Sequence, residues 1–134
     1  PSLIDLLKFI KSKKIKIYIC TNKPYILTKK IINKTPLKKF VTKYFCSDKY
    51  KLKKPNKKFF TIILNKIKLR KHQIIYIGDS MVDYNFCKNS DISFFLFKNK
   101  RVTYPKKIYL NMLKANRVFS DYKKISNLKK AIIN

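Results

Sequence analysis

The stretch Ile74-Ile75-Tyr76-Ile77-Gly78-Asp79-Ser80-Met81-Val82-Asp83 gives the clearest structural signal in this sequence. Its apolar first half predicts a buried strand over Gln73–Ile77, and a helix is expected over Met81–Asn89. Gly78, the only glycine among the 134 residues, falls between them. Because glycine has no Cβ, the backbone there can turn tightly and approach a ligand closely. The stretch therefore predicts polar residues at the carboxyl end of a buried strand.

Strands and helices alternate on both sides of this stretch. Further strands are expected over Ile15–Cys20, Tyr44–Ser47, Ile92–Phe97 and Arg117–Phe119. Helices are expected over Ser2–Lys13, Pro24–Asn33, Pro36–Thr42, Asn56–Lys68, Tyr109–Lys114 and Tyr122–Ile133, with a basic loop over Asp48–Pro55. This alternation predicts a single α/β domain over residues 1–134, with a mainly parallel sheet. Ligands of such sheets bind beyond the carboxyl ends of the strands.

Composition narrows the class of protein. The apolar content is 46%, as in globular domains, and no apolar run approaches the roughly 18 residues of a membrane span. We therefore expect no membrane partner. The cysteines are Cys20, Cys46 and Cys87, with no CxxC spacing, and His72 is the only histidine, so no zinc site is predicted. The three thiols are expected to be buried in a reducing, cytoplasmic environment.

The formal net charge of +28 suggests nucleic-acid binding as one alternative. However, 31 of the 34 basic residues are lysine, and they are spread almost evenly along the chain. Lysine, isoleucine and asparagine are the residues that A/T-rich codons encode, so mutational drift accounts for this composition without a binding role. A dedicated nucleic-acid module usually adds arginine and clustered aromatic residues. We expect no specific nucleic-acid partner.

Asp79 and Asp83 are two of only six acidic residues in the chain. A pair of carboxylates at a strand end suits a hard cation such as Mg²⁺. Alternatively, Ser80 and Asp83 form a capping box at the start of the next helix. That alternative explains Ser80, but it does not explain Gly78-Asp79.

Two weaker signals lie earlier in the chain. Thr21 and Asn22 end a buried strand just before a helix, where a hydroxyl and free backbone N–H groups can bind an anion or can simply cap the helix. Lys54, followed by Pro55, could hold a cation over a phosphate group, although one lysine among 31 is weak support by itself.

Together, the three signals resemble the motifs of the haloacid dehalogenase superfamily in their order and spacing. Thr21-Asn22-Lys23-Pro24 matches the second motif of that family, Lys54-Pro55 the third, and Gly78 to Asp83 the fourth, G-D-S/T-x-x-D. The phosphoglycolate phosphatase group is the most similar branch, because these three forms recur together there. The resemblance extends over essentially the whole chain and implies a Rossmann-like three-layer sandwich.

The resemblance also implies a reaction and a role for each residue. In such enzymes an aspartate attacks the phosphorus of a phosphate monoester and forms an aspartyl-phosphate, with Mg²⁺ as the cofactor. Thr21 and Asn22 would bind phosphate oxygens. Lys54 would bind phosphate and stabilise charge around the nucleophile. Asp79 would bind Mg²⁺, and Asp83 would support that metal site.

The first motif of the family, D-x-D with a Gly-Thr turn, is missing. The only acidic residue before Thr21 is Asp5, which lies in an expected amphipathic helix. In the family, the first motif ends a central strand between the strands that lead to Thr21 and Asp79. We therefore expect that strand, and a helical cap, upstream of Pro1. As a fragment with a core incomplete at its N-terminus, this chain is expected to be inactive and poorly stable.

Other functions stay open at this point. A relative that has lost its nucleophile could serve as a non-catalytic binding or scaffold protein. A response-regulator receiver shares the architecture, but it needs an acidic cluster on its first strand, which is absent. For an enzyme, the expected partner is a small phosphorylated metabolite, with phosphoglycolate ahead of a sugar phosphate or a nucleotide.

Overall fold

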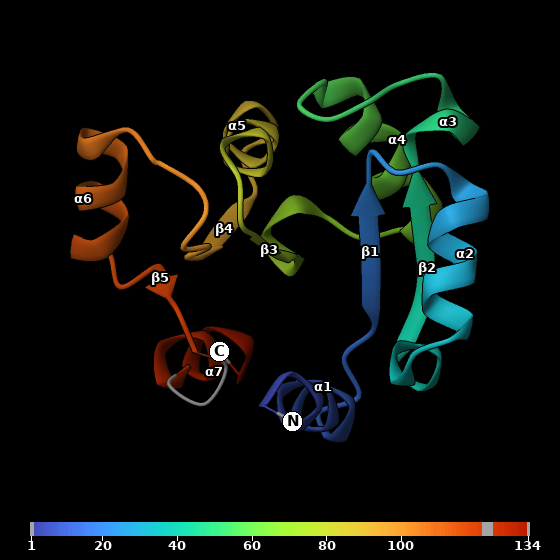
Figure 1. Cartoon of the computed structure of the whole chain (residues 1–134), viewed down its shortest axis with the longest axis horizontal. Helices are drawn as coiled ribbons and strands as arrows, with labels where there is room; N and C mark the ends of the chain where they lie inside the picture. The colour runs from blue at the N-terminus through green and yellow to red at the C-terminus, as the bar shows by residue number, and fades with distance from the viewer. Residues whose placement is uncertain (1, 122–124, 134) are drawn as a thin grey trace.

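Every strand pair in the structure is parallel. The computed structural model describes residues 2–121 and 125–133, in which five strands form two sheets (Figure 1). In one sheet, β1 (Ile17–Thr21) pairs with β2 (Val41–Cys46). In the other, β4 (Ser93–Phe97) lies between β3 (Ile75–Gly78) and β5 (Val118–Phe119). The predicted α/β class with a parallel sheet is confirmed.

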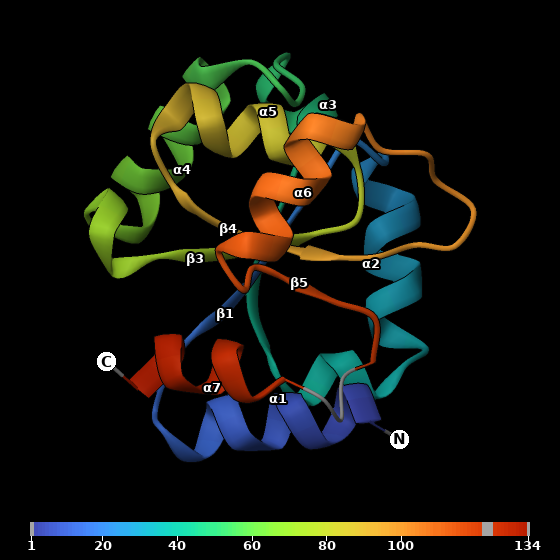
Figure 2. The same ribbon diagram turned by 90° about the vertical axis from the view of Figure 1, so that its left-hand side faces the viewer.

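Helices cover both faces of the strands (Figure 2). The first and last helices, α1 and α7, lie on one face, and α4, α5 and α6 lie on the other. The helices are α1 (Ser2–Ser12), α2 (Tyr25–Asn33), α3 (Ser47–Tyr50), α4 (Lys57–Ile67), α5 (Met81–Ser90), α6 (Lys106–Lys114) and α7 (Ser126–Ile133). Short 3-10 turns, η1 (Pro36–Lys39) and η2 (Lys71–Gln73), complete the elements. The arrangement is the three-layer sandwich that the sequence predicts.

Each face of β4 has its own apolar core, because successive side chains of a strand point to opposite faces. The larger core lies under α4, α5 and α6 and consists of Phe45, Phe59, Phe60, Ile63, Phe86, Cys87, Ile92, Phe94, Leu96 and Met112. The smaller core lies under α1 and α7 and consists of Leu6, Ile10, Phe95, Phe119, Ile125 and Leu128. Burial on both faces explains the continuous apolar run of this strand.

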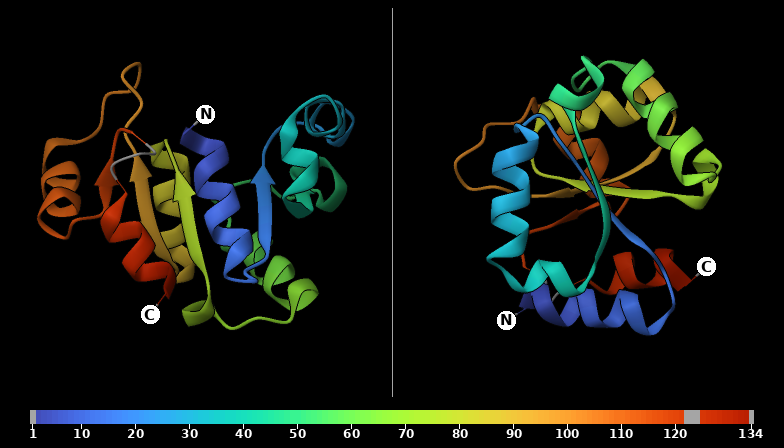
Figure 3. Two further views of the ribbon diagram at one scale, coloured as in Figure 1. Left: turned by 90° about the horizontal axis from the view of Figure 1, so that it is seen from below. Right: turned by 90° about the vertical axis from the view of Figure 1, so that its right-hand side faces the viewer.

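The two sheets do not join. β1 pairs only with β2 and β3 only with β4 among the described residues, so each leaves one edge unpaired. Figure 3 (left) shows β1 and β3 pointing the same way, with α1 in front of the space between them. Side chains of both strands, Tyr18 and Cys20 from β1 and Tyr76 from β3, pack against the larger core. We refer to this space between the facing edges of β1 and β3 as the inter-sheet slot.

Several expected elements differ from the observed ones. The helix expected over Pro36–Thr42 is wrong beyond Lys39, because Val41 and Thr42 belong to β2. The basic loop expected over Asp48–Pro55 begins with the short helix α3. The helix expected from Tyr109 starts at Lys106. Of the closing helix expected over Tyr122–Ile133, residues 122–124 lie outside the described residues, and α7 begins at Ser126.

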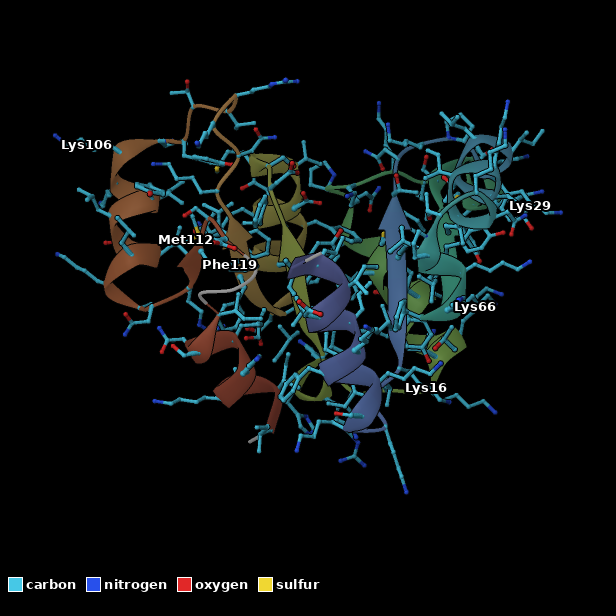
Figure 4. All side chains as sticks on the ribbon, turned by 60° about the horizontal axis from the view of Figure 1, so that its bottom comes forward. Lys16, Lys29, Lys66, Lys106, Met112 and Phe119 are labelled. Atoms are coloured by element: carbon cyan, nitrogen blue, oxygen red, sulfur yellow. The ribbon has the colours of Figure 1, made fainter. Side chains whose placement is uncertain are left out.

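Lysine side chains project from the surface in several directions. Figure 4 shows Lys16, Lys29, Lys66 and Lys106 projecting outward, while Met112 lies inside the fold. Of the thiols, Cys46 and Cys87 are buried, but Cys20 is only partly buried, which corrects the expectation of three buried cysteines. Among the described residues, no helix is both long enough and apolar enough to cross a membrane.

Candidate active site

The residues singled out by the sequence gather at the carboxyl ends of β1 and β3, on both sides of the inter-sheet slot. Thr21 is the last residue of β1, and Asp79 directly follows the last residue of β3. Asp83 lies in the first turn of α5. Lys54 comes from the loop between α3 and α4, and its Nζ lies 2.5 Å from Asp83 Oδ1. The chain therefore brings together a lysine and a carboxylate that are 29 residues apart.

Asp83 is a buried anchor with four polar partners. Its Oδ1 accepts hydrogen bonds from Lys54 and from the Tyr76 hydroxyl, the latter at 3.1 Å. Its Oδ2 accepts from the Ser80 hydroxyl at 2.8 Å and from the Asp79 N–H at 3.3 Å. Each carboxylate oxygen therefore accepts two hydrogen bonds from the chain, whereas a direct Mg²⁺ ligand would be expected to keep an oxygen open for the ion.

The electrostatics of Asp83 follow from these partners. Burial alone would raise the pKa of its carboxyl group. The Lys54 ammonium and the hydrogen bonds from Lys54, Ser80 and Tyr76 outweigh burial and lower that pKa below its usual value. Asp83 is therefore an anion at neutral pH, paired with a lysine whose side chain is 12% exposed.

Gly78 is required by the close approach of Asp83. A Cβ added at Gly78 would lie 2.5 Å from Asp83 Cβ and 2.7 Å from Asp83 Oδ2. The backbone of Gly78 does not have a positive φ angle. The sequence predicted that a ligand approaches the backbone at this glycine. In the structure, the group that lies against it is the side chain of Asp83.

Asp79 is exposed, in contrast to Asp83. Its Oδ2 accepts a hydrogen bond from Asn99 Nδ2 at 3.1 Å, and its backbone carbonyl accepts one from the Tyr104 hydroxyl. Among the described residues, no cluster of three or more His, Cys, Asp or Glu side chains could hold a metal ion. Mg²⁺ commonly takes one or two protein carboxylates and completes its shell with water and substrate phosphate. Asp79 fits that chemistry as one ligand.

Thr21 and Asn22 differ in what they leave available. The Thr21 Oγ1 accepts a hydrogen bond from the Lys23 N–H at 3.0 Å, which leaves the hydroxyl proton to donate. The Asn22 side chain forms two bonds with the backbone of Lys54: Oδ1 accepts from its N–H at 2.9 Å, and Nδ2 donates to its carbonyl at 3.2 Å. Asn22 therefore holds the loop that carries Lys54 in place, a role that the sequence did not suggest in addition to the expected phosphate contact.

The Ser80 cap is confirmed. Ser80 is the N-cap of α5, and its hydroxyl oxygen accepts from the Asp83 N–H at 3.3 Å. The same hydroxyl donates to the Asp83 carboxylate. The cap and the proposed site are thus one arrangement, because the helix start that Ser80 fixes is the turn that carries Asp83.

Four residues of this region were missed by sequence reasoning: Tyr76, Asp48, Asn99 and Tyr104. Tyr76 bridges Lys54 and Asp83, and burial raises the pKa of its hydroxyl so that it remains a donor. Asp48 accepts from the Tyr25 N–H through both carboxylate oxygens at 3.1 Å and so caps α2. Tyr76 lies in β3, and Asp48 and Asn99 come two residues after β2 and β4, so position near a strand end was the available signal for these three. Tyr104 lies just before α6 and had no such signal.

The same neighbourhood also affects the Cys20 thiol. Burial raises the pKa of its thiol to about 12 and outweighs the opposite effect of Lys54. A thiol with that pKa is protonated at neutral pH and is a poor nucleophile. Cys20 is therefore a packing residue beside the site.

Comparisons with known proteins place this arrangement in a family. The family model for haloacid dehalogenase-like hydrolases matches residues 1–97. A search of curated proteins finds no match to this chain. Similar solved structures include a proposed β-phosphoglucomutase from Thermotoga maritima, with 20% identity and a TM-score of 0.78 over 97% of this chain and 59% of that one.

Two further structures resemble the chain at similar levels. A proposed phosphoglycolate phosphatase from Lactobacillus delbrueckii subsp. bulgaricus has 19% identity and a TM-score of 0.75, over 98% of this chain and 52% of that one. CbbY from Rhodobacter sphaeroides, in complex with phosphate, has 13% identity and a TM-score of 0.76, over 94% and 55%. The chain thus spans little more than half the length of these structures. At such identities the structures show the fold, and the family model shows the kinship: the chain belongs to the haloacid dehalogenase-like hydrolase family.

Proposed function

We propose that this chain carries most of the active site of a Mg²⁺-dependent phosphate monoester hydrolase of the phosphoglycolate phosphatase type. The observation that carries the proposal is the placement of Thr21, Lys54 and Asp79 around the carboxyl end of the inter-sheet slot. A hydroxyl, an ammonium and a carboxylate at one edge of a parallel sheet provide a donor, a positive charge and a cation ligand for a phosphoryl group.

Each residue has a role in that proposal. The Thr21 hydroxyl donates to a phosphate oxygen. Lys54 supplies positive charge beside the nucleophile and the phosphate, with its ammonium aimed by Asp83 and Tyr76. Asn22 holds the backbone of Lys54, and Asp79 presents a carboxylate to the cation. Bound Mg²⁺ would supply positive charge that lets an anionic nucleophile approach an anionic phosphate.

The nucleophile is proposed to lie on a strand that fills the inter-sheet slot. Within the described residues neither facing edge has a strand partner, and a parallel strand between β1 and β3 could pair with both. Such a strand would end beside Thr21 and Asp79, where an aspartate could attack phosphorus and release the alcohol of the substrate. Without it the site lacks a nucleophile, so we propose that the chain by itself has no turnover.

The substrate is proposed to be a small phosphorylated metabolite, with phosphoglycolate first. The motif pattern and the resemblance to a proposed phosphoglycolate phosphatase support this order. The phosphate complex of CbbY supports a phosphoryl group as the recognised part. A helical cap outside the described residues would select the rest of the substrate.

Activity assays test the catalytic part. We expect no hydrolysis of phosphoglycolate by the chain alone. A longer product, translated in frame from the upstream coding DNA and containing a D-x-D strand, should hydrolyse it in the presence of Mg²⁺ and lose this activity on removal of Mg²⁺ by a chelator. Turnover by the chain alone would contradict the proposal, as would an inactive longer product with an intact D-x-D strand.

Phosphate binding tests the rest of the site and separates the second candidate, a non-catalytic binding protein. Inorganic phosphate should bind the chain in the presence of Mg²⁺ at physiological salt, and Thr21→Val should weaken this binding severalfold. Thr61→Val, a matched change at an exposed position of α4, should not. If phosphate binds specifically but no upstream D-x-D strand is encoded, the hypothesis of a non-catalytic binding protein replaces that of an enzyme.

A further inference from the structure

The segment between β4 and α6 reaches back to Asp79, although the sequence marked nothing there. Figure 2 shows this segment, residues 98–105, looping out beyond the end of β4 before α6 begins. Two of its side chains, Asn99 and Tyr104, bond to Asp79 across 20 and 25 residues. The exposed carboxylate of the proposed cation site is therefore held by a third segment of the chain.

The hydrogen bonds of Asn99 determine which way its amide points. Its Oδ1 accepts from the Arg101 N–H at 2.9 Å, and its Nδ2 donates to Asp79 Oδ2 at 3.1 Å. A backbone N–H can only donate, and a carboxylate can only accept, so exchanging the amide oxygen and nitrogen would break both bonds. The turn at Asn99–Val102 thus directs a hydrogen-bond donor at one oxygen of Asp79.

Tyr104 fixes the main chain at the same residue. Its hydroxyl accepts from the Asn99 N–H at 3.2 Å and donates to the Asp79 carbonyl. Its ring stacks on Tyr109 of α6, with the centroids 6.0 Å apart. Tyr104 therefore links the start of the segment, the backbone of Asp79 and the helix that follows.

These contacts leave one carboxylate oxygen for a ligand. Asn99 occupies Oδ2 of Asp79, and no bond to Oδ1 is found within the described part of the chain. A carboxylate with one oxygen held and one oxygen open is oriented for monodentate binding of a hard cation. Groups that hold a ligand in this way commonly change metal affinity by about 10- to 100-fold when they are removed.

We propose that Asn99 and Tyr104 are positioning residues for Asp79. Asn99 holds the carboxylate through Oδ2, and Tyr104 holds the backbone carbonyl of the same residue, so that Oδ1 faces a bound divalent cation. That a cation binds here rests on the proposed function, whereas the positioning of the carboxylate by these two residues does not. The segment 98–105 is then part of the active site, although neither residue touches the reacting atoms.

The six aspartates and the absence of glutamate make a direct experiment possible. The full chain labelled with ¹³C at aspartate Cγ should give six resonances, and Asp79→Asn identifies the one from Asp79. In metal-free protein, Asn99→Leu should shift that resonance and Tyr104→Phe should shift it less. The matched controls Asn65→Leu, at an exposed site on α4, and Tyr109→Phe should leave it in place.

A Mg²⁺ titration of the same samples gives the second readout. We expect the Asp79 resonance to move with Mg²⁺ and the apparent Kd to rise on the order of 10-fold in Asn99→Leu. An unchanged metal-free resonance in both variants would overturn the positioning role, and so would a Kd equal to that of the unaltered chain. If the unaltered chain shows no response to Mg²⁺, the proposed cation is contradicted, while the metal-free shifts still decide whether Asn99 and Tyr104 hold the carboxylate.

Discussion

Lys54 differs from the other lysines of this chain in its surroundings. Its side chain is 12% exposed, its ammonium contacts Asp83, and it lies 5.8 Å from the centre of the Tyr76 ring. Most charged groups gain little from an exposed ion pair, but a buried pair leaves an uncompensated charge when one partner is removed. Lys54 is therefore the lysine on which the local structure depends.

Replacing Lys54 by methionine should cost about 3 kcal/mol of unfolding free energy, because it leaves the Asp83 carboxylate buried and unpaired. Urea unfolding followed by circular dichroism measures this. Lys58→Met, at an exposed position of α4, is the control and should change stability by less than about 0.5 kcal/mol. The double variant Lys54→Met with Asp83→Asn should recover part of the loss; a double variant no more stable than Lys54→Met would contradict the pairing.

The lowered pKa of Asp83 predicts how stability depends on pH. The native carboxyl group binds a proton less readily than the unfolded one, whose pKa is about 4, so unfolding takes up a proton in acid. Its contribution is complete above about pH 4 and is lost as the pH falls through the native pKa. Thermal unfolding midpoints should therefore fall in acid, and Asp83→Asn should flatten that fall.

Asp91→Asn provides the comparison for this pH experiment. The Asp91 side chain is 92% exposed and lies 3.8 Å from Lys71, so its ion pair is screened by solvent. The variant should keep the acid dependence of the unaltered chain. An equal flattening in both variants would mean that Asp83 is not the group responsible.

Sequence reasoning found the polar residues of the site but not their partners. Thr21 and Asp79 each follow an apolar run, and Lys54 precedes a proline just ahead of a helix, and those positions are visible in the sequence. The pairing of Lys54 with Asp83 is not, because nothing local to either residue specifies a contact across 29 positions. The close approach that requires Gly78 is likewise created by tertiary packing.

Some helices and strands also differ from those that the local sequence predicts. Val41 and Thr42 continue an expected helix, yet the structure places them in β2, where Val41 pairs with Ile17 of β1. Pairing between distant segments overrides a weak local preference, and β-branched residues suit a strand. The helix α3 has only four residues, too few for a periodic pattern to reveal. Long segments with strong periodicity, such as α4, were predicted to within a residue at each end.

Helix ends show the effect of having a single glycine. Helices commonly end in a left-handed residue, a position that glycine occupies without strain. Here the C-cap residues that follow α4 and α5, Lys68 and Asp91, both have a φ of 56°. A side chain in that conformation costs roughly 1 kcal/mol, so the composition of this chain lowers its stability at several turns.

Lys68→Gly should therefore raise the unfolding free energy by about 0.5–1 kcal/mol. The Lys68 N–H donates to the Leu64 carbonyl, a bond that glycine keeps. Chemical unfolding of the full chain measures the gain. Lys66→Gly is the matched control: it lies inside α4, where glycine should destabilise by about 1 kcal/mol. A loss of stability in both variants would contradict the left-handed cap.

The protein as a whole carries a formal net charge of +28. Lysines project from several sides of the fold, with no single basic face among the labelled examples in Figure 4. A charge spread in this way predicts weak, sequence-independent attraction to polyanions. The alternative, a specific nucleic-acid binder, can be distinguished from this by a simple binding test.

Binding to unrelated DNA duplexes should show equal affinities at low salt and should disappear as salt is raised. Fluorescence anisotropy with two duplexes of different sequence is sufficient. A strong preference for one sequence that persists at physiological salt would contradict the view that the charge is incidental. An exposed-lysine variant such as Lys106→Gln should reduce the affinity equally for both duplexes.

The inter-sheet slot also has a consequence for how copies of the chain behave in solution. Unpaired strand edges can pair with any extended segment, including those of other copies, and so promote aggregation. A net charge of +28 opposes this, because the copies repel one another over distances that salt screens. We expect the chain to stay dispersed at low salt and to form larger particles as salt is raised, which light scattering can follow. A strand that filled the slot would remove that dependence, because it would pair with both edges.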